Sequence, residues 1–378
     1  MPKVNTVTTI YLIQVMAFLA LCMCLVGCTQ EVADTQTVET KETNDHAAVV
    51  KASSTMVPLP PWSAGDQRGM ANTLGVGTLM RCAFHLNRPG ARIYELSHLR
   101  SNEMPSSPWV ARIQYEYSPT LGLPNSIIAY HPGVKVTGVS GAQGTQMDAF
   151  GHWGYLDEIW DGEGEFPSEK VKYYGGYAQS EVKPTLDSPL QRLGIDKAPP
   201  IITSAVLLDA KTYLGEGKPM KPGQQIHGID IENMLEAQGL GWRGLLPGDV
   251  LYIYTGWSDN WGEDFYYDGG PGLSFDAAKY LEAKMIVLVA LDNPFTDAVN
   301  LGQFTGKAEP PPGAPAGVSA PVHHHNLTHS GIHNIQNAKL AEMAEDKVWT
   351  SCTVVLPIKV KGGAGAPVNP IAIGVPEV

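Results

Sequence analysis

The stretch Ser140-Gly-Ala-Gln-Gly-Thr-Gln-Met-Asp-Ala-Phe-Gly-His152 follows an apolar run and contains three glycines, one carboxylate and one histidine. We interpret it as a glycine-rich turn after a strand, which would deliver Asp148 and His152 to one place. Carboxylate and imidazole together form a ligand set that zinc and manganese accept. Taken alone, the stretch also fits Asp148 as a backbone cap and His152 as a buried imidazole. Evidence from other parts of the sequence is needed to choose between a metal site and these structural roles.

A second group of ligand side chains lies nearer the C-terminus, where His323, His324, His325, His329 and His333 follow one another closely. On a helix, His325, His329 and His333 would share one face, because residues four apart are neighbours. A solvated polar face is the alternative interpretation. The histidines therefore indicate a metal site only in combination with the Asp148 stretch.

Apolar runs rich in β-branched residues alternate with helical patterns along the chain. Helices are predicted over 229–238, with Asp230 as the cap, and over 274–284, with Ser274 as the cap. Alternating strands and helices predict the α/β class, and no linker or repeat divides residues 58–378, which predicts one domain. The predicted strands span 127–130, 134–139, 201–208, 250–254, 285–291 and 348–358.

The composition excludes some classes of protein. Lys and Arg number 26 against 38 Asp and Glu, for a formal charge of -12, whereas a nucleic-acid-binding protein needs a basic surface to neutralise phosphates. We therefore expect no nucleic-acid partner. The 40 glycines and 29 prolines imply many turns and disfavour an all-helical fold. Residues 307–321, with three consecutive prolines, are predicted to form a long surface loop that would be a candidate lid.

Residues 1–27 have the pattern of a lipoprotein signal peptide. Residues 10–26 are almost wholly apolar, and Leu25-Val26-Gly27-Cys28 resembles a lipobox, whose cysteine is lipidated after cleavage. An uncleaved membrane-spanning helix is the alternative, because the run is close to the length that a bilayer requires. We predict that Cys28 carries a lipid and that no other part of the chain contacts the membrane.

Residues 28–57 lack aromatic side chains and are predicted to be a disordered tether. Thr29 rather than an aspartate follows the lipidated cysteine, a pattern typical of delivery to the outer membrane. The predicted location is therefore extracytoplasmic, lipid-anchored and facing the periplasm. Cys82 and Cys352 remain in the folded part; an oxidising compartment permits a disulfide between them, but two separate buried thiols would also fit.

The chain resembles the cyclase family, which includes bacterial kynurenine formamidase and isatin hydrolase and whose motif is His-x-Gly-Thr-His-x-Asp-x-Pro-x-His. Four positions match the motif: Gly144, Thr145, Asp148 and His152. Three depart from it, with Ala142 and Gln146 in place of its first two histidines and Phe150 in place of its proline. A Gly-Thr-Gln variant also occurs in the family. Other similar stretches are 94–98, 104–105, 247–250, 255–257 and 271–274, in the same order.

The resemblance implies a swivelling β/β/α-like domain with a mixed sheet and flanking helices, and a homodimer. In the family a histidine followed twelve residues later by a glutamate forms the second half of the metal site. Here His324 precedes Gln336 by twelve residues. The implied metal ligands are therefore Asp148, His324, Gln336 and Gln146, with the neighbouring histidines as secondary candidates, and His152 would donate and accept the proton.

The departures from the motif reduce the number of ligands. Members of the family with two metals use several histidines and two carboxylates, whereas this chain keeps only the carboxylate of Asp148. With fewer ligands and less negative charge, one divalent ion, manganese or zinc, is expected in place of two. Activity without a metal is the alternative.

The implied reaction is hydrolysis of a non-peptide amide, either an aryl formamide, as for an arylformamidase, or a cyclic amide. Trp153 and Phe150 would stack on an aromatic substrate, although aromatic side chains are more often part of a core. Two other functions fit the same residues. One is a metal-free binding protein for a small molecule on this scaffold, and the other is a cyclase or dehydratase.

Overall fold

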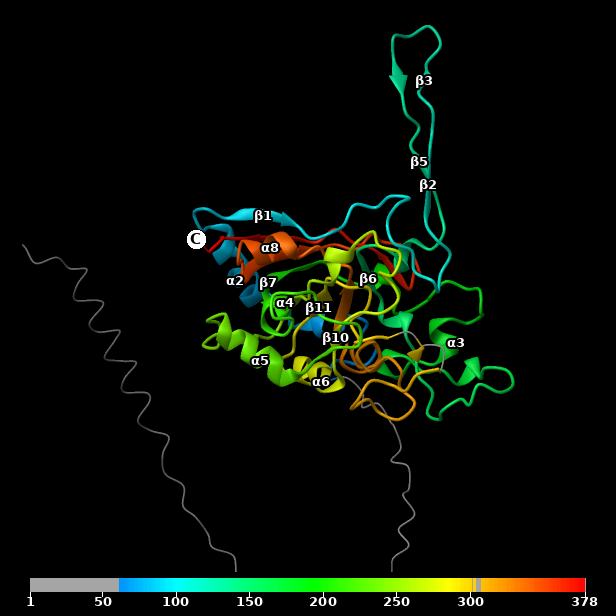
Figure 1. Cartoon of the computed structure of the whole chain (residues 1–378). Helices are drawn as coiled ribbons and strands as arrows, with labels where there is room; N and C mark the ends of the chain where they lie inside the picture. Colours follow the sequence, from blue (N-terminus) through cyan, green and yellow to red (C-terminus); the bar gives the residue numbers. More distant parts are fainter. Residues whose placement is uncertain (1–60, 301, 304–306, 378) are drawn as a thin grey trace, which may run out of the picture. The chain divides into compact units, whose positions relative to one another are not determined.

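The computed structural model describes residues 61–300, 302–303 and 307–377. Its centre is a mixed sheet with the strand order β1-β15-β13-β7-β9-β11-β12-β6-β14 (Figure 1). The neighbours β7, β9, β11 and β12 pair in parallel, and the outer strands pair antiparallel. This architecture confirms the α/β class and the mixed sheet. The strands are Arg92–Glu95 (β1), Gln146–Asp148 (β6), Ile201–Asp209 (β7), Val250–Tyr254 (β9), Leu288–Leu291 (β11), His333–Gln336 (β12), Thr350–Val355 (β13), Gly365–Pro367 (β14) and Ile371–Gly374 (β15).

The central strands are buried on both faces, which explains their continuous apolar sequences. In β9, Val250 and Tyr252 lie in one hydrophobic cluster, while Leu251 and Ile253 lie in the cluster on the opposite face. The alternation follows from the two-residue period of a strand. Four of the predicted strands, over 201–208, 250–254, 285–291 and 348–358, correspond to β7, β9, β11 and β13.

Helices α5 (Gly228–Ala237) and α6 (Phe275–Ala283) cover one face of the sheet (Figure 1). The Ser274 cap is confirmed, because its hydroxyl accepts a hydrogen bond from the Ala277 amide at 3.3 Å. The predicted Asp230 cap is wrong by one turn: the helix starts after His227, and the Asp230 carboxylate accepts from the His227 amide at 2.8 Å. An acidic residue in the first turn resembles a cap in sequence because both bind free amides.

The remaining helices are short apart from α2, which packs on β7 and β13. A disulfide joins Cys82 in α2 to Cys352 in β13, with the two Cα atoms 4.3 Å apart, so the pairing that the sequence left open is present. The helices other than α5 and α6 are α2 (Val76–Leu86), α3 (Gln179–Val182), α4 (Ala210–Tyr213), α7 (Pro321–His324) and α8 (Ala341–Glu345).

A two-stranded arm projects from the sheet (Figure 1). It pairs β2 (Gln114–Tyr117) with β5 (Val134–Thr137), and beyond them β3 (Leu121–Gly122) with β4 (Ala129–Tyr130). The predicted strands 127–130 and 134–139 thus belong to this arm and are shorter than expected. Nearly all of its side chains are exposed, including the apolar Ile127 and Ile128.

The described part of residues 307–320 contains no helix or strand, as expected of a loop, and α7 begins at Pro321. None of the helices in the described ranges is long and apolar enough to cross a bilayer. The predicted signal peptide, Cys28 and the tether lie outside the described residues. The described residues belong to one compact unit.

Candidate functional site

Strand register brings three polar side chains of the predicted site to one face of the sheet. β6 pairs with β12 so that Gln146 lies opposite Gln336 and Met147 lies opposite Ile335. Met147 and Ile335 are buried in a hydrophobic cluster on one face. Because side chains alternate along a strand, Gln146, Asp148 and Gln336 project to the other face.

His323 completes the group, which we call the Asp148 cluster: Asp148, His323 and Gln336. Gln336 Nε2 donates to Asp148 Oδ2 at 2.6 Å and lies 3.1 Å from His323 Nε2. His323 Nε2 is 3.4 Å from Asp148 Oδ2. All three residues are buried, so three polar side chains converge at one point of the interior.

Asp297 fixes the position of His323. Its carboxylate accepts hydrogen bonds from the Val322 amide at 2.6 Å and the His323 amide at 3.1 Å, at the start of α7. The same carboxylate lies 2.5 Å from His323 Nδ1, and Thr296 Oγ1 lies 3.0 Å from that nitrogen. One imidazole nitrogen is thus held by Asp297, and the other faces Asp148 and Gln336.

The charges in the cluster stabilise each other. Burial by itself would lower the pKa of His323, but its hydrogen bonds to Asp148 and Asp297 and their charges raise it to about 9. Burial would raise the pKa of Asp148, but the hydrogen bond from His323 and the charge of His152 lower it below its ordinary value. Without a metal, the cluster therefore contains an imidazolium between two carboxylates.

His152 lies next to this cluster in a 3-10 turn, η3 (Phe150–His152), which directly follows β6. The residue is exposed to solvent, yet the surrounding protein disfavours its charged form and lowers its pKa, against the opposing effect of Asp148. The His152 side chain is therefore recessed among protein groups but still in contact with solvent. Trp153 packs between the two histidines, with ring centroids 6.1 Å from His152 and 5.2 Å from His323.

The family model described as "Putative cyclase" matches residues 59–298, more than half of the chain. The chain belongs to the cyclase family. The match includes Asp148 and His152 and ends before His323 and Gln336, so the other half of this cyclase-family site is positioned by the structure. A search of curated protein sequences gave no significant match.

Solved structures share the cyclase-family fold. One, described as a novel cyclase, is 21% identical with a TM-score of 0.65, covering 82% of this chain and 95% of that chain. An isatin hydrolase bound to the product analogue thioisatinate is 14% identical with a TM-score of 0.52, covering 78% and 96%. Isatin hydrolase A from Ralstonia solanacearum is 17% identical with a TM-score of 0.51, covering 77% and 95%. At these identities the likeness concerns the fold.

Two ligand atoms of the Asp148 cluster have the spacing that a divalent ion requires. Ligand atoms bound at roughly 2.1 Å from an ion lie about 3 Å from each other, and His323 Nε2 is 3.4 Å from Asp148 Oδ2. Gln336 would bind through Oε1, which requires its amide to turn, because Nε2 now faces these two atoms. Gln146 Oε1 and Gln336 Oε1 are buried and have no hydrogen-bond partner in the described structure. A buried acceptor without a donor costs about 1–3 kcal/mol, which a cation would offset. The residues therefore fit a divalent ion.

The structure brings His323, and not His324, to Asp148 and Gln336. The ring of His324 instead lies against Tyr155, with centroids 6.0 Å apart, and burial lowers the pKa of His324 to about 4. His323 precedes Gln336 by thirteen residues, one more than the twelve-residue spacing of the family that indicated His324. The ligand role of His324 is a prediction that this geometry does not favour.

Other predicted residues lie apart from the cluster. Phe150 is 2% exposed and stacks on His333, with ring centroids 4.3 Å apart, so packing occupies the ring that was predicted to bind substrate. His325 and His329 share one face, as predicted, in the π-helical segment η9 (His325–Ser330). His333 does not join them, because Gly331 takes the left-handed conformation, with φ 72°, and ends the helix.

Sequence reasoning missed Thr296, Asp297 and Glu282. The first two lie in the loop that follows β11, at the carboxyl end of a parallel strand, where ligand-binding residues gather in α/β folds. The position of Asp297 shortly after a predicted buried strand could therefore have marked it as a candidate site residue. Glu282 lies within a predicted helix, and its sequence gives no sign that it faces His325 and His329.

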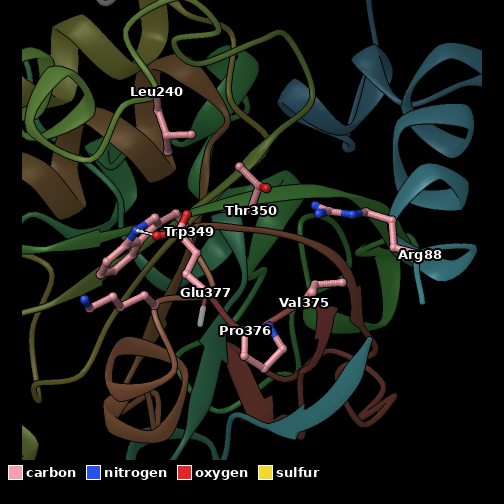
Figure 2. A pocket seen from close by; sticks show the side chains of 8 residues that line it. Arg88, Leu240, Trp349, Thr350, Val375, Pro376 and Glu377 are labelled. Carbon is pink, nitrogen blue, oxygen red and sulfur yellow. Dashed lines mark hydrogen bonds between the residues drawn. The ribbon is translucent and has the colours of Figure 1, made fainter. Parts of the chain in front are cut away.

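A separate pocket lies at another part of the molecule (Figure 2). In it Trp349 Nε1 donates to Glu377 Oε2 at 3.2 Å. None of its lining residues belongs to the Asp148 cluster, so it contributes nothing to that chemistry. The lining residues are Arg88, Leu240, Lys347, Trp349, Thr350, Val375, Pro376 and Glu377.

Proposed function

We propose that the protein is a hydrolase of a non-peptide amide, either an aryl formamide or a cyclic amide. The observation that carries the proposal is the convergence of Asp148, His323 and Gln336 beside the recessed His152. This arrangement combines a cation-binding group with a proton-transfer group, which is what hydrolysis of an unactivated amide needs.

One divalent ion, manganese or zinc, would be held by Asp148, His323 and Gln336, with Gln146 Oε1 as a further donor. When bound, such an ion supplies a Lewis acid that polarises a carbonyl group and lowers the pKa of water. His323 can serve as a ligand only after Nε2 loses its proton, so the ion and the proton compete for the same atom. Asp297 then orients the ring through Nδ1.

His152 would act as the acid and base. Its lowered pKa keeps the imidazole neutral near pH 7, so that it accepts a proton from the attacking water while the water oxygen bonds to the carbonyl carbon. The C–N bond then breaks, and His152 returns the proton to the leaving nitrogen. The products are a carboxylic acid and an amine, and one water is consumed.

Trp153 would position the substrate. Its ring is half-buried between His152 and His323, and its indole Nε1 has no hydrogen-bond partner in the described structure. The ring offers a stacking surface for an aromatic amide. Cyclic amides are included because isatin hydrolases share the fold.

The proposal is tested by incubating the purified protein with formanilide and with isatin, each with and without added manganese or zinc. We expect turnover that Asp148→Ala abolishes and that Asp187→Ala, at an exposed carboxylate, leaves unchanged. Oxygen-18 from labelled water should enter the product. Binding of the amides without turnover would favour the binding-protein alternative, and product formation without the label would favour a cyclase or dehydratase.

We further propose that the protein works outside the cytoplasm, anchored by lipid on Cys28 to a bacterial membrane and facing the periplasm. The Cys82–Cys352 disulfide supports this location, because disulfides persist in oxidising compartments. Mass spectrometry of the mature N-terminus tests the proposal. An unmodified Cys28 in a chain that retains residues 1–27 would contradict it.

A homodimer is also proposed, with the β2–β5 arm contacting the second copy. Two-stranded ribbons are marginally stable alone in water, and the apolar side chains of Ile127 and Ile128 at the tip are exposed. Light scattering of Ile127→Asp tests the role of the arm. A dimer that survives this change at the same concentration would show that the arm is not part of the interface.

A further inference from the structure

A second cluster of ligand side chains includes residues of the same segment that carries His323. It consists of Glu282, His325 and His329, which we call the Glu282 cluster. His325 Nε2 lies 2.8 Å from Glu282 Oε2, and His329 Nε2 lies 3.3 Å from Glu282 Oε1. One ligand atom from each residue lies within 4.8 Å of the other two, so the three side chains converge on one point.

Local structure explains why they meet. In α6, Ala277, Ala278 and Leu281 are buried against the sheet, which leaves Glu282 on the side that faces η9. The π-helical geometry of η9 stacks the rings of His325 and His329 with their centroids 4.7 Å apart. Single-turn π-helices are rare and are frequent at functional sites.

We propose that Glu282, His325 and His329 bind a zinc ion, or a divalent transition-metal ion of similar preference, at a site separate from the Asp148 cluster. Two imidazoles and one carboxylate form a common zinc ligand set, with a further position left for water. Around an ion with bonds of roughly 2.0–2.1 Å, tetrahedral ligand atoms are about 3.3 Å apart. His329 Nε2 and Glu282 Oε1 already have this separation. His325 Nε2 lies 2.8 Å from the other carboxylate oxygen, Oε2, so a small movement of the His325 or Glu282 side chain would complete the site.

The burial of the cluster suits an ion that keeps a water ligand. The side chain of His325 is 7% exposed, whereas those of His329 and Glu282 are 20% and 33% exposed. The ion can therefore enter from solvent without local unfolding. The edge contact of Phe275 with His325, with ring centroids 5.5 Å apart, restrains one ligand ring in advance.

An ion at this site would join α6 to the segment 321–330. His323 lies two residues before His325 in that segment, and its neighbour Val322 is buried in the same hydrophobic cluster as α6. The site would therefore stabilise the segment that carries a member of the Asp148 cluster. This role is structural and does not place the Glu282 cluster in contact with substrate.

The test is the zinc content and thermal unfolding of the full protein, purified without a histidine tag. Glu282→Gln and His329→Ala should each lose about one equivalent of zinc relative to the wild type. Asp148→Ala should keep that equivalent. His227→Ala is the matched control, because His227 pairs with Asp276 of α6 at 2.8 Å. No third ligand side chain joins this pair among the described residues, so the variant should also keep the zinc.

Added zinc should raise the unfolding temperature of the wild type and not that of Glu282→Gln. Cobalt should give the visible absorption of a tetrahedral site, and His329→Ala should abolish it. His329 is partly exposed, so this second variant tests the proposal even where Glu282→Gln folds poorly. Equal zinc content in the wild type, Glu282→Gln and His329→Ala would overturn the proposal, whatever the Asp148 cluster binds, and would leave a hydrogen-bonded His–Glu group.

Discussion

The Asp148 and Glu282 clusters both take histidines from one ten-residue segment, 321–330, and differ in how the fold builds them. The Asp148 cluster joins two strands and a helix start and is buried, with side chains at most 7% exposed for His323 and Asp148. The Glu282 cluster joins one helix to the next helical segment and is partly exposed. Two carboxylates flank one histidine in the first, and one carboxylate meets two histidines in the second.

This difference shows how burial changes what a ligand cluster must contain. A charge removed from water is tolerated when partners of opposite charge and hydrogen-bond donors surround it. Asp148 and Asp297 supply those partners to His323. The Glu282 cluster remains in contact with water, which screens its charges, so its side chains depend less on each other. The two clusters should therefore respond differently to the loss of one member.

The largest expected contrast is in stability and activity after removal of one carboxylate. Asp148→Ala should lower the free energy of unfolding of the metal-free protein by about 3 kcal/mol or more, because it removes the buried carboxylate that pairs with His323 Nε2 and accepts from Gln336 Nε2, and should abolish turnover. Glu282→Gln should cost about 1 kcal/mol or less, because that site is partly exposed. Urea denaturation in the presence of a chelator measures both. Equal losses would contradict the contrast drawn between the clusters.

The next effect concerns His152, which lies beside the Asp148 cluster only. His152→Gln should lower kcat by about 10²–10⁴-fold, the usual range for loss of an acid or base. In the wild type, the pKa of His152 lies below its ordinary 6.5. Because the neutral form accepts the proton, kcat/KM should stay level as pH falls toward 6.5 and decline only below it. An acidic limb that persists in His152→Gln would assign that limb to another group.

Adjacent histidines provide a sharper comparison. His323→Ala should lower kcat/KM by about a hundredfold or more, since it removes an ion ligand and the ring that Asp297 orients. His324→Ala should change kcat/KM by less than about threefold, because its ring contacts Tyr155 outside the cluster. The ratio of the two effects tests which histidine belongs to the site. A larger loss of kcat/KM with His324→Ala would support His324 as the ligand, as the twelve-residue spacing predicted.

The smallest effect should come from returning a carboxylate to the Asp148 cluster. Gln336→Glu should raise the affinity for manganese or zinc by about tenfold, because an added charge strengthens binding of a divalent ion. It should also destabilise the metal-free protein, since Gln336 now donates to Asp148 at 2.6 Å and a carboxylate there would repel it. Isothermal titration and chelator-dependent unfolding measure the two effects. Unchanged affinity would indicate that residue 336 does not bind the ion.

Several features could be predicted because they depend on local pattern. The central strands β7, β9, β11 and β13 appear as apolar runs, and Ser274 appears as a cap before a helical pattern. β6 and β12 could not be predicted in this way, because they are polar: Gln146, Asp148, Asn334 and Gln336 are buried only through partners that come from elsewhere in the chain.

The sequence by itself determined the α/β class, the family motif from Gly144 to His152, and a histidine group that had to meet it. Those features depend on residue periodicity and on the spacing of residue types, which are properties of the linear chain. Only the tertiary structure decided that His323 meets Asp148, that Asp297 orients it, and that Glu282 meets His325 and His329. The physical reason is that a strand register and a helix rotation are set by long-range packing, and one residue of difference turns a side chain to another face.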